Sequence, residues 1–390
     1  MTYQVTHSRS PHFLWHIVTL VVVAYIASVV ASADPVGPEA ASVKDVFRIA
    51  PHGDCVVLPV STHFGVYQFL VDTGASSTGY DTKLRHQLTQ IAEGTTHTGM
   101  RFPIFEASPA SIGSLQLRKS PVVTRDLSTF RKEFGHPIYG FIGMSDLRSR
   151  ILQIDFDGGR CRFVEELDID IGDPFDLEVE AGTGLHVVRI GVNPQLNVKM
   201  LIDTGFDGDL AIKKKLFDSL VSSDDIVVRQ KISLSKLTGA QSAWEGSLKS
   251  LQLGPFSHSH ISVIRHDEAN LIGLGYLSRF FVTFDFPNKK MFLKPGREFR
   301  RKSWSNALGA NVLLEDDDFV LHSVGEFTPA GEAKMAKGDV ILEIDDRKAS
   351  GLSLFEVRQL FSEAGKRRQI KFRRSNDVHE INVLLREIKK

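Results

Sequence analysis

An internal repeat constrains the fold of this chain more than any other feature. Residues 55–74 begin with CVVLPVS and end with VYQFLVDTG, and residues 186–205 begin with HVVRIGV and end with NVKMLIDTG. The aspartates of the two DTG motifs, Asp72 and Asp203, are 131 positions apart. Agreement of this kind at a fixed separation indicates one structural unit that is present twice.

A second landmark repeats further along the chain. Ile142-Gly143 follows the first DTG motif and Ile272-Gly273 follows the second, and the two glycines are 130 positions apart. Short apolar runs lie between turn-forming residues, and the chain carries 26 Phe and 31 Gly. This pattern favours strands and tight turns over long helices. The sequence therefore predicts a mainly β fold built from two copies of one lobe.

Composition excludes several classes of protein. In 390 residues, 47 Lys and Arg are balanced by 47 Asp and Glu, so nothing drives non-specific binding to nucleic acid. The two cysteines, Cys55 and Cys161, form no CxxC motif, which excludes a cysteine-ligated zinc site. Whether they pair with each other stays open. No cofactor or metal is predicted.

The amino terminus predicts export. Residues 13–33 contain no charged side chain, follow Arg9, and end in Ala31-Ser32-Ala33 before Asp34. A basic start, an apolar run and small residues at a cleavage position are typical of a signal peptide. The run is also long enough to anchor the chain in a membrane if it is retained. Both interpretations of residues 1–33 place the rest of the chain outside the cytoplasm.

The repeated DTG motif carries the candidate chemistry. Each copy ends an apolar run, and Gly74 and Gly205 allow a sharp turn there that projects the preceding aspartate. If the lobes pair about a pseudo-twofold axis, Asp72 and Asp203 meet. Two carboxylates at close range share one proton, which leaves one base for a water molecule and one acid for a carbonyl oxygen. This arrangement suits hydrolysis of a peptide bond without a metal.

These motifs resemble the pepsin/retropepsin superfamily of aspartic proteases over about residues 50–297. The resemblance implies a bilobal β fold, a polypeptide substrate, a dyad of Asp72 and Asp203, and a catalytic unit that is complete in one chain. It also implies that the two DTG threonines cross-link the loops and that each Ile-Gly pair packs beneath its motif. The supporting residues that the resemblance implies are Thr73, Gly74, Thr204, Gly205, Ile142, Gly143, Ile272 and Gly273.

The sequence departs from pepsin-like enzymes at two places. Ala75 and Phe206 follow the DTG motifs where pepsin-like enzymes carry Ser or Thr, and loss of that hydroxyl predicts a higher dyad pKa and an optimum from mildly acidic to near neutral pH. The candidate substrate-covering hairpins, at 93–100 and 237–240, lack the flap tyrosine of that branch. Asp207 is interpreted as an exposed acid in a turn.

A third unit follows the repeat. A loop at Leu308-Gly309-Ala310 precedes the strand 319–324, a Gly-Asp-hydrophobic strand at 338–344 and an amphipathic helix at 353–363. This order resembles a PDZ domain of the kind attached to exported bacterial proteases. The resemblance implies that a peptide adds as a strand and that the N–H groups of Leu308, Gly309 and Ala310 hold its terminal carboxylate. A purely structural role for this small α+β domain is the alternative.

The predicted domains are an export segment (1–33), a first lobe (45–165), an acidic linker (166–184), a second lobe (185–297) and a PDZ-like domain (303–390). His258, His260 and His266 alternate in what is interpreted as a surface strand rather than a zinc site, because the first copy lacks equivalent histidines. The function predicted is that of an exported aspartic endopeptidase. The alternative is an inactive peptide-binding protein that works through its PDZ-like domain.

Overall fold

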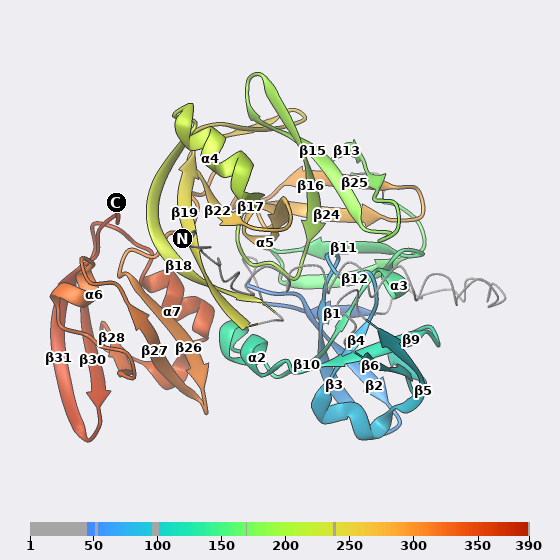
Figure 1. Ribbon diagram of the computed structural model, residues 1–390, viewed down its shortest axis with the longest axis horizontal. Helices are drawn as coiled ribbons and strands as arrows, with labels where there is room; N and C mark the ends of the chain where they lie inside the picture. Colours follow the sequence, from blue (N-terminus) through green and yellow to red (C-terminus); the bar gives the residue numbers. More distant parts are fainter. Residues whose placement is uncertain (1–44, 51–53, 96–100, 169, 237–238, 389–390) are drawn as a thin grey trace, which may run out of the picture.

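The computed structural model describes residues 45–50, 54–95, 101–168, 170–236 and 239–388 (Figure 1). The predicted export segment at 1–33 lies outside these ranges. Within them, no helix is both long enough and apolar enough to cross a membrane. The described chain is mainly β, with short helices between the strands, which confirms the predicted fold class at that level.

The first lobe is built on one sheet. Its strands, in spatial order, are β5 (Thr89–Thr95), β6 (Arg101–Glu106), β9 (Pro121–Arg125), β4 (Gly79–Asp81), β10 (Ile138–Ile142), β3 (Gly65–Val71), β2 (Val57–Thr62), β7 (Ala110–Ile112) and β8 (Leu115–Gln116). Three short helical segments belong to this lobe: η2 (Thr82–Gln87), α2 (Ser128–Phe134) and α3 (Met144–Leu147).

The second lobe repeats this strand order. Its strands are β18 (Ile226–Lys236), β19 (Gly239–Leu248), β22 (Ile261–His266), β17 (Leu210–Lys213), β23 (Leu271–Gly273), β16 (Leu196–Asp203), β15 (His186–Asn193), β20 (Leu251–Leu253) and β21 (Phe256–His258), and β14 (Glu178–Val179) pairs with β15. Its helices are α4 (Lys214–Ser222) and α5 (Leu274–Leu277). In both lobes the strand that leads into DTG runs antiparallel to its predecessor and parallel to the strand that contains the isoleucine of the Ile-Gly pair.

A third sheet joins the lobes. Its order is β1 (Val46–Arg48), β12 (Arg160–Val164), β11 (Ile151–Asp155), β24 (Phe280–Asp285), β25 (Lys290–Pro295) and β13 (Asp173–Asp176). At its centre β11 of the first repeat pairs antiparallel with β24 of the second, and Gln153 opposes Thr283. Because these two residues are also 130 positions apart, the pairing is symmetric about this point. The Gln153 amide donates to the Thr283 hydroxyl at 3.3 Å.

The segment predicted as an acidic linker, 166–184, is in part structured. Its residues form β13 and β14, and β13 pairs with β25 at the edge of the third sheet. The acidic composition obscured two apolar residues, Phe175 and Leu177, which are buried while their acidic neighbours face solvent. Asp176 pairs with Lys290 at 2.8 Å across this edge. The segment is therefore a connector with an edge strand rather than a solvated linker.

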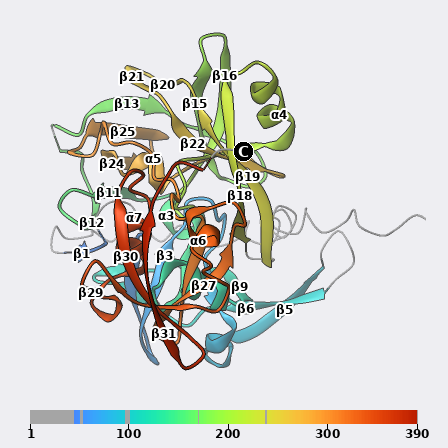
Figure 2. The ribbon, with the colours of Figure 1, turned by 90° about the vertical axis from the view of Figure 1, so that its left-hand side faces the viewer.

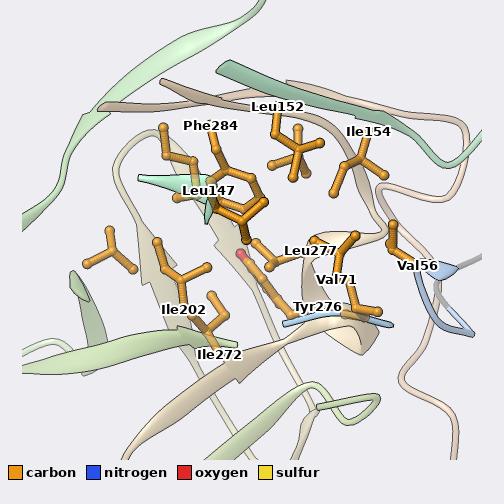
Figure 3. Packing of buried hydrophobic residues seen from close by; sticks show 14 of the residues in the cluster. Val56, Val71, Leu147, Leu152, Ile154, Ile202, Ile272, Tyr276, Leu277 and Phe284 are labelled. Carbon is orange, nitrogen blue, oxygen red and sulfur yellow. The ribbon is translucent and has the colours of Figure 1, made fainter. Parts of the chain in front are cut away.

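One hydrophobic core extends through both lobes and the third sheet. Figure 3 shows side chains from β11 and β24, such as Leu152 and Phe284, above Val71 and Ile202, which precede the two DTG aspartates. The two cysteines are free and buried, Cys161 in this core and Cys55 in a smaller cluster of the first lobe.

The carboxyl-terminal domain has its own core and sheet. The sheet order is β26 (Ala310–Glu315), β27 (Asp318–Val324), β28 (Val340–Ile344), β30 (Arg367–Arg374) and β31 (Asp377–Leu384), with β29 (Arg347–Lys348) paired to β28. Its helical segments are α6 (Pro329–Glu332), η3 (Ala349–Gly351) and α7 (Leu354–Leu360). Helix α7 begins with a complete capping box between Ser353 and Glu356, which fixes its start.

This domain lies against the lobes on the side of helix α2. In Figure 1, α2 stands between the first lobe and the strands β26 and β27, and Figure 2 views the molecule with the domain in front. Helix α2 contacts β26 and also β18 of the second lobe. It therefore touches all three parts of the described chain.

Candidate active site

The two DTG loops meet at the interface between the lobes and are joined by their threonines. The Thr73 hydroxyl donates to the Ile202 carbonyl at 2.8 Å, and the Thr204 hydroxyl donates to the Val71 carbonyl at 2.7 Å. Each hydroxyl also accepts the backbone N–H of the other threonine, at 3.1 Å in both directions. Both threonines are fully buried. Four hydrogen bonds in a symmetric set therefore fix the loops against each other.

The aspartates that precede these threonines face each other across the interface. Oδ1 of Asp72 accepts the N–H of Gly74 at 2.9 Å, and Oδ1 of Asp203 accepts the N–H of Gly205 at the same distance. A Cβ placed on Gly74 would lie 2.5 Å from the Asp203 Cγ, so each carboxyl group occupies the space that the opposite glycine leaves empty. Only glycine allows this approach. The two carboxyl groups therefore lie close together, each packed against the loop of the other.

This arrangement changes the protonation of the pair. Burial raises the pKa of Asp72 to about 6, against the hydrogen bonds from its own loop. Burial and the nearby Asp72 charge raise the pKa of Asp203 well above its usual value. Two acids that lie this close share a proton, and the pair titrates as a unit. Near neutral pH the pair therefore offers one carboxylate and one carboxylic acid.

The Ile-Gly pairs support the loops from below. The N–H of Asp72 donates to the Ile142 carbonyl at 3.0 Å. Beside it, a Cβ on Gly143 would lie 2.4 Å from the Ser77 carbonyl oxygen. In the second lobe Gly273 is the register partner of Asp203, and a Cβ there would lie 2.4 Å from the Gly208 carbonyl oxygen. The predicted supporting residues therefore surround the two aspartates.

The candidate flap hairpins are described only in part. Strands β5 and β6 pair antiparallel around the first candidate, and β18 and β19 around the second. Their tips, at 96–100 and 237–238, lie outside the described residues.

A cavity lies beside the aspartates rather than over them. It has a volume of about 850 Å³ and runs from Gly205, Phe206 and Asp207 to the first strand of the carboxyl-terminal domain. Asp207 is exposed, as predicted, and its carboxylate lies 3.9 Å from Arg358 of α7. The loop that carries Asp203 thus opens directly toward that domain.

The predicted carboxylate-binding loop lines the far end of this cavity. Gly309 has φ of 77°, and its N–H donates to the Asn306 side chain at 2.8 Å. Gly309 and Ala310 line the cavity, whereas Leu308 is fully buried beneath them. The loop precedes β26, an edge strand of its sheet. This position suits addition of an extended peptide along β26.

The histidines at 258, 260 and 266 do not form the single strand that the sequence suggested. His258 ends β21, His260 lies in the turn with φ of 57°, and His266 ends β22. A tight turn between two short strands breaks the alternation. His258 contacts the Tyr276 hydroxyl and the Phe299 carbonyl, each at 3.0 Å, which is a structural role.

Among the described residues, one group could offer three ligands to a metal ion: Asp54, Cys55 and His136. His136 already lies 2.8 Å from Asp54. Burial and the Asp54 charge raise the pKa of the Cys55 thiol well above its usual value, and this disfavours the thiolate that a metal ion requires. The donor set therefore fits a His–Asp hydrogen bond better than a metal centre.

Sequence reasoning missed helix α2 and Arg358. The segment STFRKEF places Phe130 and Phe134 four residues apart and ends at Gly135, which is a recognisable helix signal. Arg358 had no such signal, because its partners lie on three other segments of the chain.

Comparison with known proteins identifies the carboxyl-terminal unit. Residues 306–385 match the PDZ domain family, so the chain carries a PDZ domain there, and the prediction of such a unit within 303–390 is confirmed. No match is found among curated proteins. Among solved structures, a photosystem II D1 C-terminal processing protease is similar at 22% identity and a TM-score of 0.20. The match covers 21% of this chain and 23% of that protease.

Proposed function

We propose that this protein is an aspartic endopeptidase whose catalytic dyad is Asp72 and Asp203. The observation that carries the proposal is the pairing of the two carboxyl groups between loops that their own threonines lock together. Such rigid positioning of two acids with raised pKa values is what general acid–base hydrolysis requires. The resemblance of both DTG motifs to aspartic proteases supports the same conclusion.

The geometry supports a direct hydrolytic mechanism. The pair shares one proton, so one of the two aspartates is a carboxylate and the other a carboxylic acid. The carboxylate removes a proton from a water molecule as the water oxygen bonds to the peptide carbonyl carbon, while the carboxylic acid protonates the carbonyl oxygen. Breakdown transfers a proton to the amide nitrogen, breaks the C–N bond and releases an acid and an amine.

Substitution of either aspartate tests the proposal. Asp72→Asn and Asp203→Asn should each reduce cleavage of a denatured protein substrate at least about a thousandfold, because the pair acts as a unit. Asp317→Asn, a change of the same chemistry in an exposed turn, should leave the rate unchanged. Cleavage that persists in both dyad variants would exclude this mechanism, and a wild-type protein that cleaves nothing at any pH would favour the inactive peptide-binding alternative.

The PDZ domain supports a role in binding peptides, since that is what PDZ domains do. We propose that it recruits polypeptides to the adjacent dyad. From the apolar segment at 13–33 we further propose that the chain acts outside the cytoplasm, released or anchored by residues 1–33.

A further inference from the structure

Helix α2 belongs to the first lobe and has no counterpart in the second. It lies in the connection between β9 and β10 of the first lobe. The equivalent connection in the second lobe, between β22 and β23, consists of residues 267–270 and contains no helix. A pair of equivalent aspartates does not require a helix in one lobe only, so α2 calls for another explanation.

The amino-terminal end of α2 is fixed to the first lobe next to the dyad. The buried carboxylate of Asp81 accepts the N–H of Leu127 at 3.0 Å and pairs with Arg131, which also donates to the Ile138 carbonyl at 2.8 Å. Phe130 and Leu127 line a small gap that Asp72 also borders. Helix α2 therefore lies beside the end of β3, which leads to Asp72.

The carboxyl-terminal end of α2 lies in the groove between β26 and α7 of the PDZ domain. Gly135 ends the helix in the left-handed region, and a Cβ there would lie 2.9 Å from the Leu354 Cβ and 3.8 Å from the Leu314 Cδ2. Leu354 begins α7 and Leu314 lies on β26. Lys132 pairs with Glu315, also on β26, at 3.3 Å. An extended peptide that adds to β26 must occupy this same space.

Arg358 closes the groove from the other side. From α7 it donates to the Val312 carbonyl of β26 at 2.9 Å, so its side chain spans the position of an incoming strand. The same guanidinium pairs with Glu133 of α2 at 3.0 Å and lies 3.9 Å from Asp207. One side chain thus joins the PDZ groove, helix α2 and the loop that follows Asp203.

The other end of the groove is open. The loop residues Gly309 and Ala310, together with Phe361 of the segment after α7, line the 850 Å³ cavity. A terminal carboxylate can reach the loop there, but the residues that precede it meet Arg358 and α2. The groove can therefore accept the carboxyl-terminal end of a peptide, but Arg358 and α2 exclude the residues that precede that end.

From these contacts we propose that helix α2 is the resident occupant of the PDZ groove and that a polypeptide with a free carboxyl terminus binds by displacing it. Binding breaks the contacts of Arg358 with Glu133 and Asp207 and releases helix α2 and the loop that follows Asp203 from the PDZ domain. Occupancy of the groove therefore controls the dyad. This control of cleavage rests on the proposed aspartic protease function, whereas the competition for the groove does not.

Peptide binding to the full chain tests the competition. The probe is a fluorescein-labelled pool of octapeptides with free carboxyl termini, and the same pool with amidated termini is its control. Glu133→Gln removes one partner of Arg358 and leaves the sequence of the PDZ domain unchanged. This variant should bind the free-carboxylate pool about 5- to 20-fold more tightly, as measured by fluorescence anisotropy. Glu106→Gln, an exposed change in the same lobe, should leave binding unchanged.

A double-mutant cycle distinguishes loss of the Glu133–Arg358 ion pair from a general loosening of the fold. In an Arg358→Ala background, Glu133→Gln should have no further effect on peptide affinity, because the shared ion pair is already absent. Equal affinity of wild type and Glu133→Gln, or an unchanged effect of Glu133→Gln in that background, would overturn the proposal. Each variant should retain the wild-type circular dichroism spectrum.

Cleavage of a denatured protein is the second measurement. The free-carboxylate pool should accelerate cleavage by wild type, and Glu133→Gln should be active without the pool. If the binding results hold while no variant cleaves anything, the groove competition stands and the protease function fails. If cleavage occurs but the pool does not change its rate, the control of the dyad is wrong.

Discussion

At the scale of residues, the dyad imposes an electrostatic cost on the folded chain. Asp72 and Asp203 have raised pKa values because both are partly removed from solvent and lie together. The native pair therefore holds its proton more tightly than the unfolded chain does, and wild-type stability falls as the pH rises from about 4 through about 6. Above that range the protein stays folded in spite of the negative charge at Asp72 and Asp203.

Asp203→Asn should remove the part of this pH dependence that Asp203 contributes. The amide keeps an oxygen that can accept the N–H of Gly205 but carries no charge, so the variant should exceed wild type in free energy of unfolding by about 1–3 kcal/mol at pH 7.5. The difference should shrink toward zero near pH 4, where the wild-type pair is protonated. Urea unfolding at a series of pH values measures it, and a gap that is independent of pH would contradict the assignment.

The two aspartates could be predicted from sequence because a local motif occurs twice at matching positions. Arg358 could not. Its contacts join residues as far as 225 positions apart, and they depend on how three separate segments pack. The sequence interpretation of Asp207 as an exposed acid agrees with the structure, but the ion pair that gives it a role was invisible for the same reason.

At the scale of elements, the ends of strands determine the shape of the site. Gly143, the residue after strand β10, lies directly against the loop that follows Asp72, and a Cβ there would lie 2.4 Å from a backbone oxygen. Backbone atoms cannot move aside as a flexible side chain can. The loop therefore has to shift if Gly143 gains a side chain.

Gly143→Ala should reduce the free energy of unfolding by about 1–3 kcal/mol through overpacking and should also reduce the rate of cleavage. Gly351→Ala is the matched control, since no atom lies within 4 Å of the added Cβ. Urea unfolding and cleavage assays of both variants measure the effect. Equal stability of the two variants would show that the loop can accommodate the methyl group.

Sequence patterns predicted some elements better than others. The strand at 319–324 and the helix at 353–363 correspond closely to β27 and α7, because their apolar periodicity is regular and Ser353 marks the helix start. Helix α2, which has the same length as α7, was missed because no side-chain cap at Leu127 marks its start. Strand β13 was missed because acidic residues outnumber its buried apolar ones.

At the scale of the whole molecule, both halves of the site come from one chain. The hydrogen bonds between Thr73 and Thr204 and the pairing of β11 with β24 close the interface internally. Specific cleavage activity should therefore stay constant as the protein is diluted about a thousandfold, measured at fixed substrate concentration. A fall in specific activity on dilution would show that association of two copies completes the site.

The central pairing of β11 with β24 also dictates the order in which the molecule can fold. These strands are separated by about 130 residues, so closing that loop is costly and the contact is expected to form slowly. Until then β11 exposes an apolar face that includes Leu152 and Ile154, which are buried in the folded protein. During synthesis the first lobe therefore exposes this apolar strand until nearly all of the second lobe has been made. In that interval the lobe is prone to aggregate.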